Sequence, residues 1–564
     1  MSISTRLSSN HQPRVNQSHL EAWPRRLLDV ASMTSYERKP GNKYNGIKEP
    51  PYNAVSYTWG RFEDRREAPI RIKGVTWKIP GIAKHHFTVN EFHQVLKTVA
   101  GSCHFVWVDV ACIDQENDAV KMDEINHQAA IYQRAKEVYA WLTPWTTTEM
   151  HKAFHILEGF AIQFAEAKLP DGNPRLLPFS SSVAIDLNAV HATLRAMKQH
   201  GWFTSLWTLQ EAFLSRPFFL SKTAEACHYQ ACYQGQFFGG KFPVGVSFIA
   251  GHCRSIWETL RSDNSPQAVS ICQDITDSGL LGMNFFKEPY LLYPAALRRY
   301  VSLPQDAVYA IMHVFGIRLP SVDDATQLLL RLAIYINQRD PVSYQIFLHE
   351  KWVNPLDAWR MSTKTHLPYQ FFRSAITKSF CTIESYRGFR PEFAGRSTTL
   401  EDIWRYWTGV QQDRRNSRKI PYQPTVFLDA SIASNCMSLE LCDDPPAPED
   451  PDIGRLDDTY TEKMRLQDLA SVFPHPMESY RVLLLGSKEF ASYKQQSPVV
   501  CQLEYHIGLI VRQEAAGEQE PWCRVGFCSW VKWSRKDPSL GTIGTPDRIS
   551  TPYRSWPEIK CRIG

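Results

Sequence analysis

Short apolar strand patterns that alternate with helical patterns constrain the fold of this chain more than any other feature. Residues 105–110 (FVWVDV) and 138–142 (VYAWL) are apolar along nearly their whole length, and an amphipathic pattern over residues 121–136 separates them. Strands of this kind are typical of parallel sheets that are covered on both faces. Strands alternating with helices imply right-handed crossovers between parallel neighbours. The pattern therefore predicts an α/β fold built on a parallel sheet.

Further predicted elements extend this pattern in both directions along the chain. Apolar periodicity and turn residues indicate them. Upstream we expect a strand over residues 54–58, a hairpin over residues 70–79, and a helix that Asn90 caps and Gly101 ends. Downstream we expect an insertion at about residues 146–200, with helices over roughly 148–167 and 185–199, and then a short strand within residues 217–222.

The chain of 564 residues is longer than one ordinary core accommodates, so further domains are expected. Residues 1–51 are polar and are predicted to be an N-terminal extension, with one helical turn or strand near residues 27–30. Residues 223–345 are predicted to be mainly helical, and residues 346–564 to form a C-terminal mixed α/β region. Within that region, the acidic, proline-rich residues 443–458 are expected to be a surface loop or linker.

Charge and motif content argue against several classes of function. The net charge of +5 is small and no basic block occurs, so nucleic-acid binding is not expected. No run of about 18 apolar residues and no secretory signal is seen, and the 13 cysteines are scattered. We therefore expect a cytoplasmic protein with reduced thiols and no membrane span. HExxH and GxSxG are absent, and the P-loop-like residues 235–242 lack the hydroxyl that binds magnesium. No metal and no bound cofactor is predicted.

One carboxylate stands out on a predicted helix. Residues 203–215 (FTSLWTLQEAFLS) are expected to form one short amphipathic helix. Glu211 follows Trp207 by four residues, so the two side chains lie beside each other one turn apart. Burying a carboxylate on such an apolar helix costs free energy. Glu211 therefore either faces water or has a function.

Chemically versatile residues follow the predicted parallel strands. Tyr57, Trp59 and Gly60 end the first strand, and Asp109 lies at the end of the second. Ligands of open parallel sheets bind outside the carboxyl ends of the strands, so these residues are candidates to line a pocket. The alternative for Tyr57 and Trp59 is a packing cluster of aromatic rings. For Asp109, accepting backbone amides of the following loop is the first interpretation, and direct substrate contact is the second.

Three sequence blocks resemble, in order, those of the fungal heterokaryon-incompatibility (HET) domain. They are PYNAVSYTWG (51–60), FVWVDVACIDQ (105–115) followed by IYQRAKEVYAWL (131–142), and WFTSLWTLQEA (202–212). TVNEFHQVL (88–96) is similar to the connecting helix of that family, and LPQDAVYAIMHVFG (303–316) to a block that often follows the domain. The resemblance covers residues 52–222. Glu124, Gln128 and Ser205 depart from the usual family pattern.

The resemblance carries expectations about the fold and the site. HET domains are similar to TIR domains, so it implies a flavodoxin-like (TIR-like) parallel sheet with a helical insertion. Ser205, Trp207 and Glu211 match the TIR Ser-x-Trp-Cys-x-x-Glu helix at the same Trp-to-Glu spacing. In TIR enzymes that glutamate serves cleavage of the nicotinamide–ribose bond of NAD. By resemblance, Glu211 is the catalytic candidate, with Tyr57, Trp59, Gly60, Asp109 and Trp207 at the substrate site.

The resemblance also carries expectations about function. It implies a role in fungal non-self recognition and programmed cell death, with NAD as a substrate rather than a bound cofactor. A non-enzymatic signalling module that acts by assembly is the alternative, as is a structural role for Glu211 in an ion pair or loop cap. An unidentified incompatibility partner protein and self-association are the expected partners.

Overall fold

We describe the chain from a computed structural model. It describes residues 23–563 apart from residues 60–61, 65, 168–186, 234–235, 262, 264, 284–288, 321–323, 369–370, 372–374, 387–389, 416–423, 433–435, 443–460, 493–500, 514–520 and 533–551. Gly60 and the acidic segment 443–458 thus lie outside the described residues.

The chain divides into two compact units. The first comprises Met1–Ile256, Met283–Phe285 and Arg299–Ser321, and the second comprises Trp257–Gly282, Phe286–Arg298 and Val322–Gly564. The predicted domain at residues 52–222 lies in the first unit. That unit also takes in a segment, Arg299–Ser321, that is remote from the domain in sequence.

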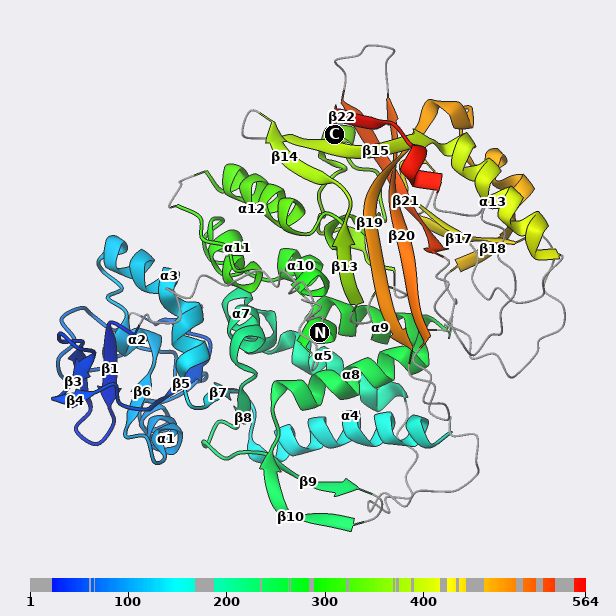
Figure 1. The fold of residues 1–564 in the computed structure, drawn as a ribbon. Helices are drawn as coiled ribbons and strands as arrows, with labels where there is room; N and C mark the ends of the chain where they lie inside the picture. Colours follow the sequence, from blue (N-terminus) through cyan, green and yellow to red (C-terminus); the bar gives the residue numbers. More distant parts are fainter. Residues whose placement is uncertain are drawn as a thin grey trace, which may run out of the picture. The chain divides into compact units, whose positions relative to one another are not determined.

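A six-stranded sheet in the order β2-β1-β6-β5-β7-β8 forms the centre of the first unit (Figure 1). β5, β6, β7 and β8 are parallel, whereas β1 pairs antiparallel with both β2 and β6. The strands are β1 (Arg26–Asp29), β2 (Thr34–Glu37), β5 (Tyr52–Ser56), β6 (Phe105–Trp107), β7 (Val138–Trp141) and β8 (Phe218–Leu220). The predicted α/β fold with a parallel sheet is confirmed.

The order of the parallel strands contains a reversal beside β5. The chain passes from β5 to β6 on one side, and then returns to β7 and β8 on the other side. The crossovers run through α1 (Val89–Ala100), then α2 (Asp109–Cys112) and α3 (Asp118–Arg134). In open α/β sheets the crevice at such a reversal is where ligands bind.

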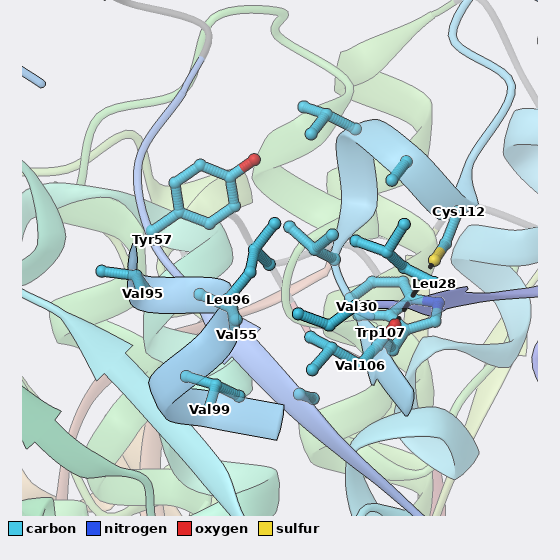
Figure 2. Close-up of a cluster of buried hydrophobic side chains, with 14 of the residues drawn as sticks. Leu28, Val30, Val55, Tyr57, Val95, Leu96, Val99, Val106, Trp107 and Cys112 are labelled. Atoms are coloured by element: carbon cyan, nitrogen blue, oxygen red, sulfur yellow. Dashed lines mark hydrogen bonds between the residues drawn. The ribbon is translucent and has the colours of Figure 1, made fainter. Parts of the chain in front are cut away.

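Burial on both faces explains the apolar character of the central strands. Every residue of β5 and of β6 is buried. Figure 2 shows part of this core, in which Val55 and Val106 of the strands pack with Val95, Leu96 and other residues. Tyr57 lies at the margin of the drawn cluster with its hydroxyl turned away from Val99.

The helix after the first strand begins differently from the prediction. Thr88, not Asn90, caps α1, and its hydroxyl accepts the backbone N–H of Glu91 at 3.2 Å. The Glu91 carboxylate in turn accepts the Thr88 N–H at 2.7 Å. This reciprocal capping box satisfies two N–H groups at once, which Asn90 as a cap would not do.

Two other predicted elements differ from the structure. β6 ends at Trp107, and Asp109 starts the short helix α2 instead of continuing the strand. Residues 70–79 pair through a single bridge, Ile70 with Ile79, because the Lys73 backbone pairs with Met33 and with Ser35 of β2. At the turn, Gly74 has a φ of +76°, and a Cβ there would lie 2.4 Å from the Ser35 carbonyl oxygen. A regular hairpin is therefore absent from residues 70–79.

The expected single helix over residues 203–215 is two helices. These are α6 (Gly201–Thr204) and α7 (Leu206–Ser215), separated by Ser205 in an extended conformation. Ser205 forms an isolated bridge with Tyr300, and the Leu206 N–H donates to the Tyr300 carbonyl at 3.2 Å. Pairing with a distant segment therefore interrupts the helix.

The other elements of the first unit flank this sheet. Residues 26–37, which the composition assigns to the N-terminal extension, form β1 and β2. The helices predicted for the insertion occur as α4 and α5, on either side of residues 168–186. These elements are β3 (Lys43–Tyr44), β4 (Ile47–Lys48), α4 (Thr147–Ala167), α5 (Leu187–Gln199), β9 (His228–Tyr233), β10 (Gln236–Pro243), α8 (Val246–Leu260, which runs on into the second unit), α11 (Asp306–Tyr309) and η4 (Met312–Phe315).

A larger sheet dominates the second unit. Its order is β14-β15-β19-β20-β21-β16-β17-β18, with β13 paired to β19 and β22 to β15. β19 (Tyr480–Ser492), β20 (Cys501–Gln513) and β21 (Trp522–Lys532) are its longest strands and contain the β-prone runs of the sequence (Figure 1). The other strands are β13 (Ala375–Ser379), β14 (Thr382–Tyr386), β15 (Arg390–Thr399), β16 (Thr425–Leu428), β17 (Met437–Cys442), β18 (Thr461–Arg465) and β22 (Glu558–Arg562), with the separate pair β11 (Leu348–His349) and β12 (Thr365–His366).

This sheet is also buried on both faces. Alternate residues of β19 enter different cores: Leu483 packs in one, and Val482 and Leu484 pack in the other. The period of two places successive side chains on opposite faces. The helices of the second unit are α9 (Pro266–Ser278), α10 (Pro289–Arg298), α12 (Ala325–Arg339) and α13 (Leu400–Arg415). Its shorter helical turns are η3 (Leu280–Met283, which ends with a residue of the first unit), η5 (Ser343–Gln345), η6 (Pro355–Asp357), η8 (Leu466–Val472), η9 (Met477–Ser479) and η12 (Pro552–Ser555).

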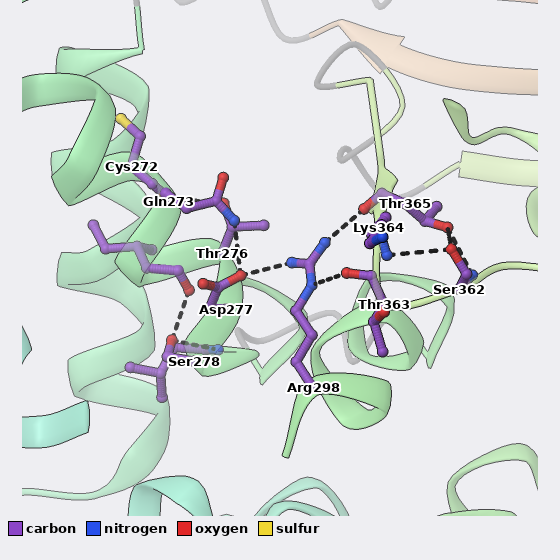
Figure 3. Close-up of polar contacts among 12 residues, drawn as sticks. Cys272, Gln273, Thr276, Asp277, Ser278, Arg298, Ser362, Thr363, Lys364 and Thr365 are labelled. Atoms are coloured by element: carbon purple, nitrogen blue, oxygen red, sulfur yellow. Dashed lines mark hydrogen bonds and ion pairs between the residues drawn. The ribbon is translucent and has the colours of Figure 1, made fainter. Parts of the chain in front are cut away.

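Arg298, the last residue of α10, ties α9 to the β12 region of this unit. Its guanidinium pairs with Asp277 at 2.6 Å and donates to the carbonyl oxygens of Thr363 and Thr365, each at 2.8 Å (Figure 3).

Within the part of the chain that the structure describes, no helix is both long and apolar enough to span a bilayer.

Candidate active site

A polar cluster lies at the carboxyl ends of the parallel strands. β5 ends at Ser56, β6 is followed closely by Asp109, and α7 carries Glu211. α7 contacts both β5 and α3. The Trp202 indole of α6 donates to the Ser56 hydroxyl at 2.8 Å, which anchors this helical segment to the end of β5.

Glu211 points into this cluster and is 7% exposed. The Gln128 amide of α3 lies 3.4 Å from Oε1. The hydroxyls of Ser56 and Tyr132 face the carboxyl and favour its charged form. Among the described residues, Oε2 has no hydrogen-bond partner of good geometry. Glu211 is therefore a buried carboxyl with an unused oxygen.

Burial dominates the acidity of Glu211. Desolvation raises the pKa of its carboxyl from 4.5 to about 8, and the nearby Asp109 charge adds to this effect. The Ser56 and Tyr132 hydroxyls offset part of the rise in this pKa. A carboxyl that titrates near neutral pH in a strand-end cluster is a candidate for acid–base or electrostatic catalysis.

Asp109 and Tyr57 form the second part of the cluster. The Tyr57 hydroxyl donates to Asp109 Oδ1 at 2.8 Å, and the Val110 N–H donates to the same oxygen at 2.7 Å. Burial raises the pKa of Asp109, and these hydrogen bonds and Lys121 counteract that rise. Asp109 thus holds a backbone amide, as the first interpretation of this residue expects. It also fixes the direction of the Tyr57 hydroxyl.

α3 also contributes to this site, although none of its residues is among the predicted site residues. Gln128 and Tyr132 are buried and one turn apart, and both face Glu211. Gln128 Oε1 also accepts from Gln210 at 3.1 Å. Glu124, one turn earlier, is buried as well and accepts the Arg25 N–H at 2.9 Å. Polar side chains four residues apart inside an otherwise apolar helical stripe were the available signal.

The segment Arg299–Ser321 borders the site at α3 and α7. The Trp207 indole lies 3.4 Å from Asp306 Oδ2, and His313 hydrogen-bonds the Ile125 carbonyl of α3 at 2.9 Å. Arg299 donates to the Ser205 carbonyl at 2.8 Å. Lys121 lies close enough to lower the pKa values of both Asp109 and Asp306 against the rise from burial. This segment is therefore part of the structure that holds α7.

Aromatic rings pack beside the cluster. The Trp59 ring meets those of Tyr57 and Phe87 at centroid distances of 6.1 and 6.0 Å. His86 hydrogen-bonds the Thr58 carbonyl at 3.1 Å and the Thr143 hydroxyl at 3.1 Å, which links the ends of β5 and β7. These contacts match the packing interpretation of Trp59.

A comparison with protein-family models gives one match. Residues 52–211 match the family described as Heterokaryon incompatibility protein (HET). Residues 52–211 are a HET domain. The match ends at Glu211, so it contains the strand-end cluster described above. The bordering segment Arg299–Ser321 lies outside it. Comparisons with curated proteins and with solved structures found no match.

The HET domain brings together some of the predicted site residues and separates others. Glu211, Asp109 and Tyr57 share one cluster. Trp207 instead directs its indole to Asp306, and Trp59 packs among aromatic rings. Gly60 lies outside the described residues. The roles assigned to all six residues remain predictions.

The raised pKa of Glu211 predicts a pH-dependent stability of the HET domain. The unfolded chain ionises this carboxyl near pH 4.5, whereas the folded domain keeps its proton up to about pH 8. The contribution of this carboxyl to the free energy of unfolding is therefore complete below pH 4.5 and is lost as the pH rises towards 8. We expect Glu211→Gln to raise the free energy of unfolding by about 4 kcal/mol at pH 8 and by less than about 1 kcal/mol at pH 5. Thermal unfolding of both proteins at the two pH values measures this difference.

The exposed Glu63 provides a matched control. Glu63→Gln removes the same charge from the surface of the same unit and is expected to change stability equally little at both pH values. An equal effect of Glu211→Gln at pH 5 and pH 8 would contradict the assignment of a protonated, buried Glu211.

Proposed function

We propose that this HET domain hydrolyses the nicotinamide–ribose bond of NAD, with Glu211 as its catalytic residue. The observation that carries the proposal is the buried Glu211 carboxyl, with its unused oxygen, at the carboxyl ends of the parallel strands. The order of the parallel strands, second-first-third-fourth along the chain, is also that of flavodoxin-like sheets and supports a TIR-like arrangement.

The chemistry of the bond suits this cluster. Cleavage of an N-glycosidic bond builds positive, oxocarbenium-like charge on the ribose. A carboxylate fixed beside that charge stabilises the transition state, most strongly where water is excluded. Asp109 holds the Tyr57 hydroxyl in place, and we assign this pair to positioning a ribose hydroxyl. The nicotinamide leaves as a neutral base, so the step needs no metal.

The raised pKa of Glu211 predicts the pH dependence of this reaction. In the free enzyme the carboxyl loses its proton only near pH 8. The ionised form is the one that stabilises positive charge, so kcat/KM for NAD should rise with pH and level off above about 8. The cationic nicotinamide ring of bound NAD favours the ionised carboxylate, so the pKa seen in kcat should be lower than that seen in kcat/KM. Initial rates from pH 5.5 to 9.5 measure both values, and a profile that falls across this range would contradict the role of Glu211.

The family match associates the chain with heterokaryon incompatibility. We propose that NAD loss in the cytoplasm kills cells after contact with a non-self partner protein, which releases or assembles the domain. Full-length wild type and Glu211→Gln should be expressed in parallel at matched levels while cellular NAD and viability are followed. The proposal is supported if NAD falls before death in cells that express wild type and does not fall in cells that express Glu211→Gln.

A non-enzymatic assembly module is the second candidate. The exposed apolar side chains of Tyr300 and Leu303, 52% and 56% exposed, favour it because they offer a contact surface on the same unit. In the same expression experiment, this candidate predicts that Glu211→Gln still kills while NAD stays constant. Loss of killing in a Leu303→Ser variant that retains NAD cleavage would point to assembly as well.

A further inference from the structure

A segment outside the HET match caps the helix that carries Glu211. Ser205, the residue before α7, makes no side-chain hydrogen bond to the first turn of this helix. The Tyr300 carbonyl instead accepts the Leu206 N–H at 3.2 Å, and the Tyr300 N–H donates to the Thr204 carbonyl at 3.0 Å. The first N–H groups of a helix need partners from outside the helix. The Tyr300 backbone therefore supplies a partner that the local sequence of α7 does not.

Two side chains of the same segment hold the start of α7 as well. The Arg299 guanidinium donates to the Ser205 carbonyl at 2.8 Å. Asp306 Oδ2 lies 3.4 Å from the indole nitrogen of Trp207. Arg299 and Asp306 lie outside residues 52–211, which match the family. The first turn of α7 is thus fixed by a part of the chain that the family match does not contain.

The segment also holds α3, the other helix of the site. His313 of η4 is 8% exposed, and its Nε2 lies 2.9 Å from the Ile125 carbonyl. Ile125 lies three residues, nearly one helical turn, before Gln128. η4 contacts α7 too. One segment therefore contacts both of the helices whose side chains meet where Gln128 lies 3.4 Å from Glu211.

We propose that residues 299–313 form a positioning element that sets the place of Glu211 relative to Gln128 and the strand ends. The inference rests on the proposed NAD cleavage, because it concerns the same carboxyl. Tyr300 and His313 act through α7 and α3, so they are positioning residues. A misplacement of about 1 Å at a reacting group can cost about 100-fold in rate. The catalytic unit of this chain therefore extends beyond the residues that match the HET family.

Two substitutions of Tyr300 in the full-length protein test the contact with α7. Tyr300→Pro removes the N–H that Thr204 accepts, because proline has no backbone N–H. We expect it to lower kcat for NAD at least about 10-fold and to change KM less than about threefold, because displacement of Glu211 weakens an interaction made in the transition state. The Tyr300 side chain is 52% exposed, so Tyr300→Ala retains the backbone donor and loses little packing. It should bring kcat back to within about threefold of wild type.

His313→Leu tests the contact with α3. It keeps a side chain of similar size but has no ring nitrogen to bond the Ile125 carbonyl. We expect kcat to fall about fivefold or more at nearly constant KM. This variant decides the question if Tyr300→Pro does not fold. The proposal is overturned if every variant that folds keeps kcat within about threefold of wild type, or if Tyr300→Ala loses as much activity as Tyr300→Pro.

Hydrogen–deuterium exchange of the same proteins separates failure of this inference from failure of the proposed function. Amides from Leu206 to Glu211 should exchange at least about 10-fold faster in Tyr300→Pro than in wild type or Tyr300→Ala, whether or not NAD is cleaved. A wild type that shows this difference but leaves NAD intact would contradict NAD cleavage and support the positioning of α7. An active wild type with the same exchange and the same kcat as its variants would contradict the positioning element and leave NAD cleavage standing.

Discussion

Glu211→Gln will lower kcat/KM for NAD by at least about 10³-fold, which is the scale of losing one preorganised electrostatic group. The amide has nearly the shape of the protonated carboxyl that the folded domain already holds at neutral pH. It cannot ionise, so it offers no charge to the oxocarbenium-like transition state. The loss should therefore appear in the rate of the chemical step while the protein stays folded. Initial-rate kinetics of the two purified proteins measure it.

Two further variants show whether this loss is specific to Glu211. Asp109→Asn retains an oxygen that accepts the Tyr57 hydroxyl and the Val110 N–H, so we expect a smaller loss of about 10-fold, as for a positioning residue. Glu63→Gln should leave kcat/KM unchanged. If Glu211→Gln retained more than a tenth of wild-type kcat/KM, Glu211 would not be the catalytic residue.

Asp429→Ala will destabilise the second unit by about 3–5 kcal/mol, the cost of leaving one partner of a buried ion pair alone. Arg524 is fully buried and donates to Asp429 and to the carbonyl oxygens of Phe347 and Gln345. Asp429 Oδ1 also accepts the His349 N–H at 2.8 Å. A loss of this size is a large part of the about 5–15 kcal/mol that stabilises a typical domain. Denaturant unfolding of full-length protein, followed by the strand signal in circular dichroism, measures the loss.

A surface ion pair of the same unit provides the comparison. Arg405 pairs with Glu401 on α13 and is 60% exposed, so Arg405→Met should cost less than about 1 kcal/mol. Asp429→Asn, which keeps an acceptor but not the charge, should fall between the two. If Asp429→Ala unfolded at the same denaturant concentration as Arg405→Met, the buried pair would not stabilise this unit.

The sequence predicted those parts of the HET domain that local patterns encode. Residues 138–141 and 218–220 are strands as predicted, because short apolar runs fit a sheet that is buried on both faces. Thr88 is the helix cap in place of the predicted Asn90, and Thr88 and Glu91 have capping-box spacing. This reciprocal pattern is visible in the sequence alone.

Contacts between remote segments were not predictable in the same way. Ser205 interrupts the helix because its backbone pairs with Tyr300, and nothing near Ser205 in sequence signals that partner. The resemblance places Trp207 at the substrate site, and the contact of its indole with the distant Asp306 is not signalled by the sequence around Trp207. His313 likewise meets α3 from far along the chain, and no single sequence window contains both partners.

The decisive measurement is the time course of nicotinamide and ADP-ribose release when purified full-length protein is incubated with NAD at pH 8. Chromatography of the reaction should show equimolar products that accumulate with wild type and stay at the blank level with Glu211→Gln. The raised pKa of Glu211 makes pH 8 the favourable condition, since about half of the carboxyl groups are then ionised. Intact NAD after prolonged incubation with folded wild-type protein, alone and at concentrations that drive self-association, would contradict the proposed function.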